Sequence, residues 1–146
     1  MPFIAGRGGT IDRIAVNVTT LAASGVMRCG IYDSTSDTNL YPNALILDSG
    51  ELSTASTGVK SATVSQALTA GKLYWFVTLT GTAAPTLRAL AATDLHSIFN
   101  LDNTLGTAPG RYLQVALAYG ALPSTFTASA SVTTGTVPAV FVRYSA

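Results

Sequence analysis

Charged side chains are scarce in this sequence. Asp, Glu, Lys and Arg make up 10% of its 146 residues, whereas an average soluble domain has roughly 25%. The eight Lys and Arg residues are scattered along the chain, so it lacks the basic patch of a nucleic-acid-binding protein. Because a surface with so little charge favours association, we expect partners to cover part of it.

Long hydrophobic runs are also missing. The longest, residues 73–79, has the length of a strand and falls short of the roughly 18–20 residues of a membrane-spanning helix. No basic segment followed by an apolar segment marks a signal peptide. We therefore expect no membrane insertion and assign the scarcity of charge to assembly with sister subunits or a larger particle.

The chain has a single cysteine and a single histidine, which restricts redox and metal chemistry. Cys29 lies in a strand pattern and is predicted to be a small core residue without a disulfide partner in the chain. No Cys/His spacing of a zinc site is present. His96 lies beside Asp94 and Ser97, but the members of a catalytic triad come from separate segments, so a polar turn is favoured.

One polar segment partly matches a calcium-binding loop. Oxygen-bearing side chains alternate in its first half: Asp33, Thr35, Asp37 and Asn39. The sixth position, where such a loop turns on Gly, is Thr38, and the twelfth, where a bidentate Glu belongs, is Ala44. We therefore predict a solvated hairpin turn and no metal site.

Acidic residues are too few and too dispersed to suggest catalysis. A glycan-cleaving enzyme needs two carboxylates that converge on one bond. The seven acidic residues lie mostly in turns: Asp12, Asp33, Asp37, Asp48, Glu51, Asp94 and Asp102. We expect neither enzymatic activity nor a cofactor.

Apolar and polar residues alternate over most of the chain, as in half-buried strands. The predicted strands are 10–20, 26–33, 44–48, 59–68, 72–80, 86–91, 112–119 and 139–144, with a short one around Leu52. Residues 1–9 are predicted to be a loop and 94–100 a single helical turn. This pattern predicts one all-β domain over 1–146, a two-sheet antiparallel sandwich resembling a jelly roll.

The fifth predicted strand, 72–80, is apolar on both faces and is therefore expected in the centre of its sheet. Trp75 is predicted to be a buried anchor there. The full predicted core is Ile14, Val16, Cys29, Ile31, Leu47, Leu73, Trp75, Val77, Val115 and Val142.

The segment 121–137 is long and rich in small residues. Pro123 and Phe126 are its only bulky anchors before its closing Val137, so it cannot build a core of its own. We expect it to be ordered against a neighbouring subunit or against a sheet edge, where its backbone groups find partners.

Several stretches together resemble a known family. They are Arg-Cys-Gly-Ile-Tyr-Asp at 28–33, the Leu-rich strand ending in Asp-Ser-Gly at 48–50, Ser-Thr-Gly at 56–58, Gly-Lys-Leu-Tyr-Trp at 71–75, the strand 8–20, and the segments 122–126 and 137–140. This order is similar to that of the β-sandwich modules at the tips and surfaces of tailed-bacteriophage virions.

The resemblance implies a virion structural protein, such as a tail-fibre tip, a head fibre or a capsid decoration protein. Such modules are commonly homotrimers, so the implied partners are other copies of the chain and other virion proteins. The implied location is the exterior of the tail or capsid, after synthesis in the host cytoplasm. Because the sequence starts at Met1 and is nearly all module, we expect a stand-alone component.

An alternative function is host attachment through a carbohydrate- or receptor-binding module that engages host-surface glycans. Sugar sites use exposed aromatic rings flanked by hydrogen-bonding groups. Tyr41 and Tyr112 lie near predicted turns and are the candidate ligand-binding residues, although a packing role for each stays open.

Overall fold

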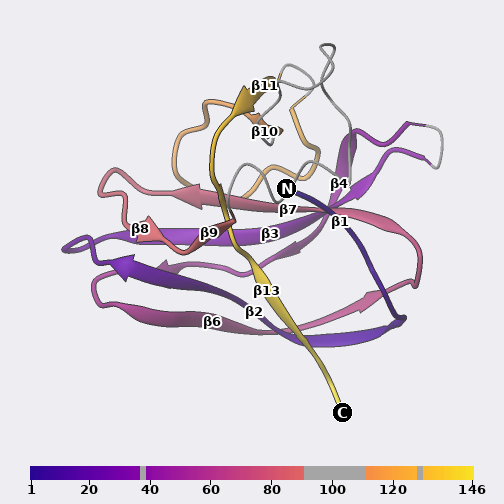
Figure 1. Ribbon diagram of the computed structural model, residues 1–146, viewed down its shortest axis with the longest axis horizontal. Coiled ribbons are helices and arrows are strands. Elements are labelled where there is room, and N and C mark those ends of the chain that lie inside the picture. Colours follow the sequence, from indigo (N-terminus) through magenta and orange to yellow (C-terminus); the bar gives the residue numbers. More distant parts are fainter. Residues whose placement is uncertain (37–38, 91–110, 128–129) are drawn as a thin grey trace.

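The computed structural model describes residues 1–36, 39–90, 111–127 and 130–146 (Figure 1). The described residues form thirteen strands and no helix, and eight of the strands are four residues or longer. Every strand pairing is antiparallel, and the two larger sheets pack face to face. The predicted all-β, two-sheet antiparallel sandwich is confirmed.

The first large sheet, called sheet I here, has four strands in the order β1 (Pro2–Ile4), β7 (Leu73–Thr80), β3 (Val26–Ser34) and β4 (Pro42–Asp48). A short fifth strand, β5 (Leu52–Ser53), also pairs with β3. The two central strands, β7 and β3, are in register from Met27 opposite Thr80 to Asp33 opposite Tyr74. The central place predicted for residues 72–80 is therefore confirmed.

The second large sheet, sheet II, has the order β13 (Phe141–Tyr144), β2 (Gly9–Thr20) and β6 (Gly58–Leu68). Strand β8 (Thr86–Leu87) pairs with the end of β2. Ile14 in the middle strand lies opposite Ala62 on one side and Val142 on the other. Sheet II thus joins segments from near both ends of the sequence.

Two small two-stranded sheets complete the described fold. One pairs β10 (Arg111–Gln114) with β11 (Ser131–Thr134), and the other pairs β9 (Ala89–Leu90) with β12 (Val137–Pro138). Figure 1 shows β10 and β11 on the sheet I side of the molecule, away from β6.

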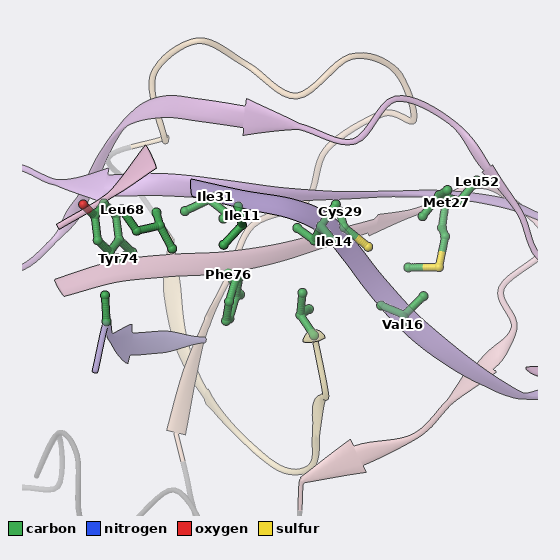
Figure 2. Close-up of a cluster of buried hydrophobic side chains, with 12 residues drawn as sticks. Ile11, Ile14, Val16, Met27, Cys29, Ile31, Leu52, Leu68, Tyr74 and Phe76 are labelled. Atoms are coloured by element: carbon green, nitrogen blue, oxygen red, sulfur yellow. The ribbon is translucent and has the colours of Figure 1, made fainter. Parts of the chain in front are cut away.

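The core between the sheets follows from strand alternation, because every second residue of each strand points inward. Figure 2 shows how these side chains meet in one layer. Three strands supply most of the inward residues: Ile11, Ile14 and Val16 from β2, Met27, Cys29 and Ile31 from β3, and Tyr74 and Phe76 from β7. Phe3 from β1 closes one side by stacking on Phe76 with ring centroids 3.8 Å apart.

The opposite face of sheet I is buried as well. Tyr32 and Trp75 lie opposite each other in the β3–β7 ladder and are buried without belonging to the core cluster between the sheets. They are 1% and 5% exposed, because the segment 121–127 and its neighbours cover this face. All of residues 73–76 are consequently buried.

The residues of the predicted core lie in two layers, one on each face of sheet I, and this corrects the prediction of a single core. Trp75 and Val77 belong to the outer face of sheet I, whereas Cys29 and Ile31 belong to the layer between the sheets. Alternation shows which residues of a strand share a face, but it does not show which face meets the other sheet. Four of the predicted core residues are only partly buried: Leu47, Val77, Val115 and Val142.

Three predicted boundaries are wrong. Residues 2–4 form β1 rather than a loop, since their backbone pairs with β7 although the stretch shows no alternation. The predicted strand 86–91 is two short strands, β8 and β9, which pair with different partners. The predicted strand 112–119 ends at Gln114. The helical turn predicted at 94–100 lies outside the described residues.

The segment 121–127 is held against a sheet edge, one of the two outcomes expected for it. The Leu45 amide of β4 donates to the Ser124 carbonyl (2.9 Å), and the Phe126 amide donates to the Asn43 carbonyl (2.8 Å). An isolated bridge joins Ala44 to Thr125 between them. Because these bonds occupy the outer edge of β4, the segment serves as an internal cover for sheet I.

Candidate functional site

A cavity of about 650 Å³ lies on the outer face of sheet I. Trp75, Val77 and Leu79 of β7 contribute its floor, because they are the outward residues of that strand. Its walls come from residues 112–117, from the segment 121–127 and from β12. The cavity therefore lies between the outer face of sheet I and the segments that cover it.

The described lining of this cavity carries no Asp, Glu, Lys, Arg or His side chain. Its polar side-chain groups are Tyr and Thr hydroxyls and the Gln114 amide. Hydroxyls and amides suit a neutral ligand that hydrogen-bonds and stacks on aromatic rings. They do not provide charges for an ionic substrate.

Trp75 serves as a structural anchor under this cavity, as predicted. Its indole nitrogen donates to the Leu40 carbonyl at 2.7 Å, and the residue is 5% exposed. A buried Trp needs such a partner for its only polar group. The ring therefore holds the 39–41 turn against β7 and offers little surface for stacking.

A glycine in β3 lets the covering segment approach the sheet closely. A Cβ at Gly30 would overlap Leu122 Cδ1 and lie 2.7 Å from the Leu47 carbonyl oxygen. The Tyr32 hydroxyl, two residues further on, donates to the Pro123 carbonyl at 2.6 Å. Leu122 thus fills the place of the missing side chain while Tyr32 fixes the next peptide.

An aspartate at the end of β4 fastens the same segment. Asp48 Oδ2 accepts from the Leu122 amide (3.0 Å) and from Arg28 Nη1 (3.0 Å), and Asp48 Oδ1 accepts from the Gly50 amide (2.9 Å). This carboxylate is three-quarters buried or more, with its side chain 21% exposed. All of these hydrogen bonds go to the protein itself, so Asp48 serves to hold the segment 121–127 in place.

The first candidate ligand-binding residue, Tyr41, is half-buried beside the covering segment. Its hydroxyl donates to the Thr127 carbonyl (2.9 Å) and accepts from the Ala130 amide (3.3 Å). Its ring meets Phe126 edge-on, with centroids 5.9 Å apart. These contacts give Tyr41 a packing role, whereas its role as a sugar platform stays a prediction.

The second candidate, Tyr112, lies on β10 and lines the cavity. It is partly exposed, and its ring passes over Gly135, where a Cβ would be 3.7 Å from the ring edge. The structure does not bring the two candidates into one site: Tyr112 lines the cavity and Tyr41 does not. Sequence patterns gave no sign of the cavity itself, because its walls come from irregular segments.

The described carboxylates are engaged in separate places. Asp33 Oδ2 pairs with Lys72 Nζ at 2.7 Å, and Asp12 Oδ2 pairs with Arg143 Nη2 at 2.7 Å. Glu51 accepts from the Tyr119 hydroxyl at 3.1 Å. No group of three potential metal ligands occurs among the residues that the structure describes.

The segment compared with a calcium loop is a hairpin turn where it is described. The Thr35 amide and hydroxyl both donate to the Tyr41 carbonyl, and the Ser36 amide donates to the Asn39 carbonyl. Asp37 and Thr38 lie outside the described residues, as do Asp94, His96, Ser97 and Asp102.

Burial shifts the acidity of two groups on β3. It raises the pKa of the Cys29 thiol, on the inner face, to about 12, and it raises the pKa of the Tyr32 hydroxyl, on the outer face, to about 12. Desolvation disfavours the charged forms of both groups. At the surface, the hydrogen bond from Arg143 lowers the pKa of Asp12. None of these shifts provides a nucleophile or a general base near neutral pH.

Comparison with family models, with curated proteins and with solved structures found no match. Within the described ranges, no helix is long and apolar enough to cross a membrane.

Proposed function

We propose that this chain is a structural protein of a tailed-bacteriophage virion. It would act as a β-sandwich module that forms a symmetric oligomer on the tail or capsid exterior, as a fibre, a fibre tip or a decoration. Its work would be to pack against copies of itself and other virion proteins, without chemistry of its own.

The sequence resemblance, spread over the whole scaffold, carries this proposal. The residues behind it fall in β2, in β3, at the start of β7 and in the segment that covers sheet I. These are the parts that build the sandwich, so the likeness concerns an entire module and not a local motif.

The uneven covering of the sandwich also supports an assembly role. Sheet I is covered by the chain's own segment 121–127, whereas the outer face of sheet II exposes apolar side chains such as Val59 (68%) and Phe141 (46%). With 10% charged residues in the chain, little repulsion opposes contact at such a face. Subunit number rests on the resemblance, which favours a homotrimer.

The direct test is copurification. We expect quantitative mass spectrometry of gradient-purified virions, from the phage or lysogen that carries the gene, to find the chain at a copy number divisible by three. Detection only in the soluble lysate, after complete virions are removed, would contradict the proposal.

A second candidate function is glycan binding at the cavity on sheet I. The observation that favours it is a neutral, hydroxyl-rich lining that includes Tyr112 and Gln114. A glycan array probed with the purified chain tests it. Tyr112→Ala should abolish retention of any bound glycan, whereas Tyr41→Phe should not. An array on which the unmodified chain binds nothing would exclude this function.

A further inference from the structure

Three of the four outer edges of the sandwich are short or covered, and the fourth is long and unpaired. In sheet I, the edge of β4 is covered by residues 124–126, and the edge strand β1 has only three residues, one of them Pro2. In sheet II, the edge strand β13 has four residues, and β6 has eleven. Natural proteins blunt edge strands by shortness, proline, charge or covering.

Over its first half, strand β6 is neither short nor covered and contains no proline, and its one charged residue, Lys60, is partly buried on the inward face. Among the described strands it pairs with β2 alone, and the backbone groups of residues 58–66 make no other hydrogen bond within the described chain. Figure 1 shows it at the lower margin of the molecule, away from β10 and β11. The edge therefore presents a row of free amide and carbonyl groups.

The only charged residue of β6, Lys60, lies on the inward face of the strand. Lys60 Nζ donates to Ser56 Oγ at 2.6 Å, so its side chain folds back toward the turn that precedes the strand. The outward-facing residues are neutral and exposed: Val59, Ser61, Thr63, Ser65 and Ala67. Val59 is the most exposed large hydrophobic residue described, at 68%.

We propose that the β6 edge pairs antiparallel with the β6 edge of a second copy of this chain, which would make sheet II continuous across two subunits. The part of β6 that pairs regularly with β2 runs from Gly58 to Thr63, before the register shifts. A two-fold axis at Ser61 sets Val59 opposite Thr63 of the second copy and Lys60 opposite Ala62 of the second copy. No like charges then lie directly opposite each other. The inward residues Ala62 and Val64, which pack against the core of their own subunit, continue across the contact beside Lys60.

This contact adds detail to the assembly proposed above. It depends on that proposal only in assuming that the chain forms an oligomer. A two-fold contact is self-complementary and gives a dimer by itself. Combined with a three-fold contact, it gives a hexamer. In both cases, breaking the β6 contact halves the mass of the particle, whereas a trimer built without it keeps its mass.

Charge substitutions at Ser61 test the proposal by light scattering at micromolar concentration. We expect the unmodified chain to have an even multiple of the 15.0 kDa subunit mass. Ser61→Lys alone and Ser61→Glu alone should each halve it, because like charges meet across the axis. An equimolar mixture of the two variants should restore the full mass, since opposite charges then face each other.

Two controls separate the outcomes. Thr20→Lys places the same charge at the exposed end of β2, where that strand pairs with β8, and should leave the mass unchanged. A far-UV spectrum checks that each variant is folded. A trimer unaffected by Ser61→Lys would overturn the edge contact and leave the proposed function standing. A monomeric unmodified chain would also overturn it, and copurification with virions would then decide the function separately.

Discussion

The two sheets of the sandwich differ in how many faces the chain itself buries. Sheet I is buried on both faces, so that residues 73–76 of β7 are all buried, whereas β6 in sheet II alternates between exposed and partly buried residues over most of its length. The same β geometry thus gives a continuous apolar run in one sheet and strict alternation in the other.

The reason for the difference is the covering segment. Leu122, Pro123 and Phe126 lie against the outer face of sheet I, and no described segment plays this part for sheet II. The assembly proposed above would therefore use sheet II and not sheet I. The predictions below test this difference, from the largest effect to the smallest.

Truncating an outward aromatic residue should be costly only on sheet I. Trp75→Ala removes a buried ring and leaves a cavity, which should lower the free energy of unfolding by about 3–5 kcal/mol. The matched change on sheet II, Phe141→Ala, should cost less than about 1 kcal/mol because Phe141 is 46% exposed. Urea denaturation measures both, and similar losses would show that the two outer faces are equally buried.

Adding a methyl group beneath the covering segment should also destabilise sheet I. Gly30→Ala forces the new Cβ against Leu122 and the Leu47 carbonyl, so we expect a loss of about 1–3 kcal/mol in chemical denaturation. Gly120→Ala, two residues before Leu122, has open space around its Cβ and should stay within about 0.5 kcal/mol. A neutral Gly30→Ala would mean that the segment is not seated on β3.

The loss of stability at alkaline pH should show how well Cys29 on β3 is shielded from water. Burial raises the pKa of Cys29 from 9.0 to about 12, so folding favours the neutral thiol. This contribution is complete below pH 9 and is lost as pH rises toward 12, at about 1.4 kcal/mol for each pH unit. Between pH 8 and pH 10, the unmodified chain should lose about 1.4 kcal/mol more than Cys29→Ala. Equal losses would show that the thiol is accessible to water.

Removing a single hydroxyl group should give the smallest difference in stability between the two sheets. Tyr32→Phe loses the buried bond to Pro123 on sheet I and should cost about 1 kcal/mol. Tyr144→Phe loses an exposed bond to the Arg7 carbonyl on sheet II and should cost only a few tenths, roughly 0.3 kcal/mol. Thermal denaturation of the two variants ranks them, and a larger loss for Tyr144→Phe would show that the Tyr32 hydroxyl contributes little to holding the covering segment.

The regular part of the fold was predictable from the sequence. Alternation located the five long strands to within two residues at each end, and the apolar run from Leu73 indicated a strand buried on both faces. These signals are local, since each strand carries its own pattern of burial.

The cover, the cavity and the division of the core were not predictable. Nothing in the pattern around Leu122 indicates that it would fill the space above Gly30, because that contact joins residues far apart in the sequence. Tyr41 was expected near a turn, but its hydroxyl bonds to Thr127 and Ala130 join residues far apart in the sequence. Tertiary contacts of this kind do not produce a periodic pattern in the sequence.

The amide of Leu45 has a further use as a reporter of motion. It is bonded to the Ser124 carbonyl, so its proton can exchange with solvent deuterium only when the cover lifts or the whole sandwich unfolds. If the cover opens on its own, Leu45 exchanges faster than the amides shared by β3 and β7. The observed Leu45 rate divided by the intrinsic exchange rate of that amide in an unfolded chain then gives the population of molecules in which the outer face of sheet I is uncovered.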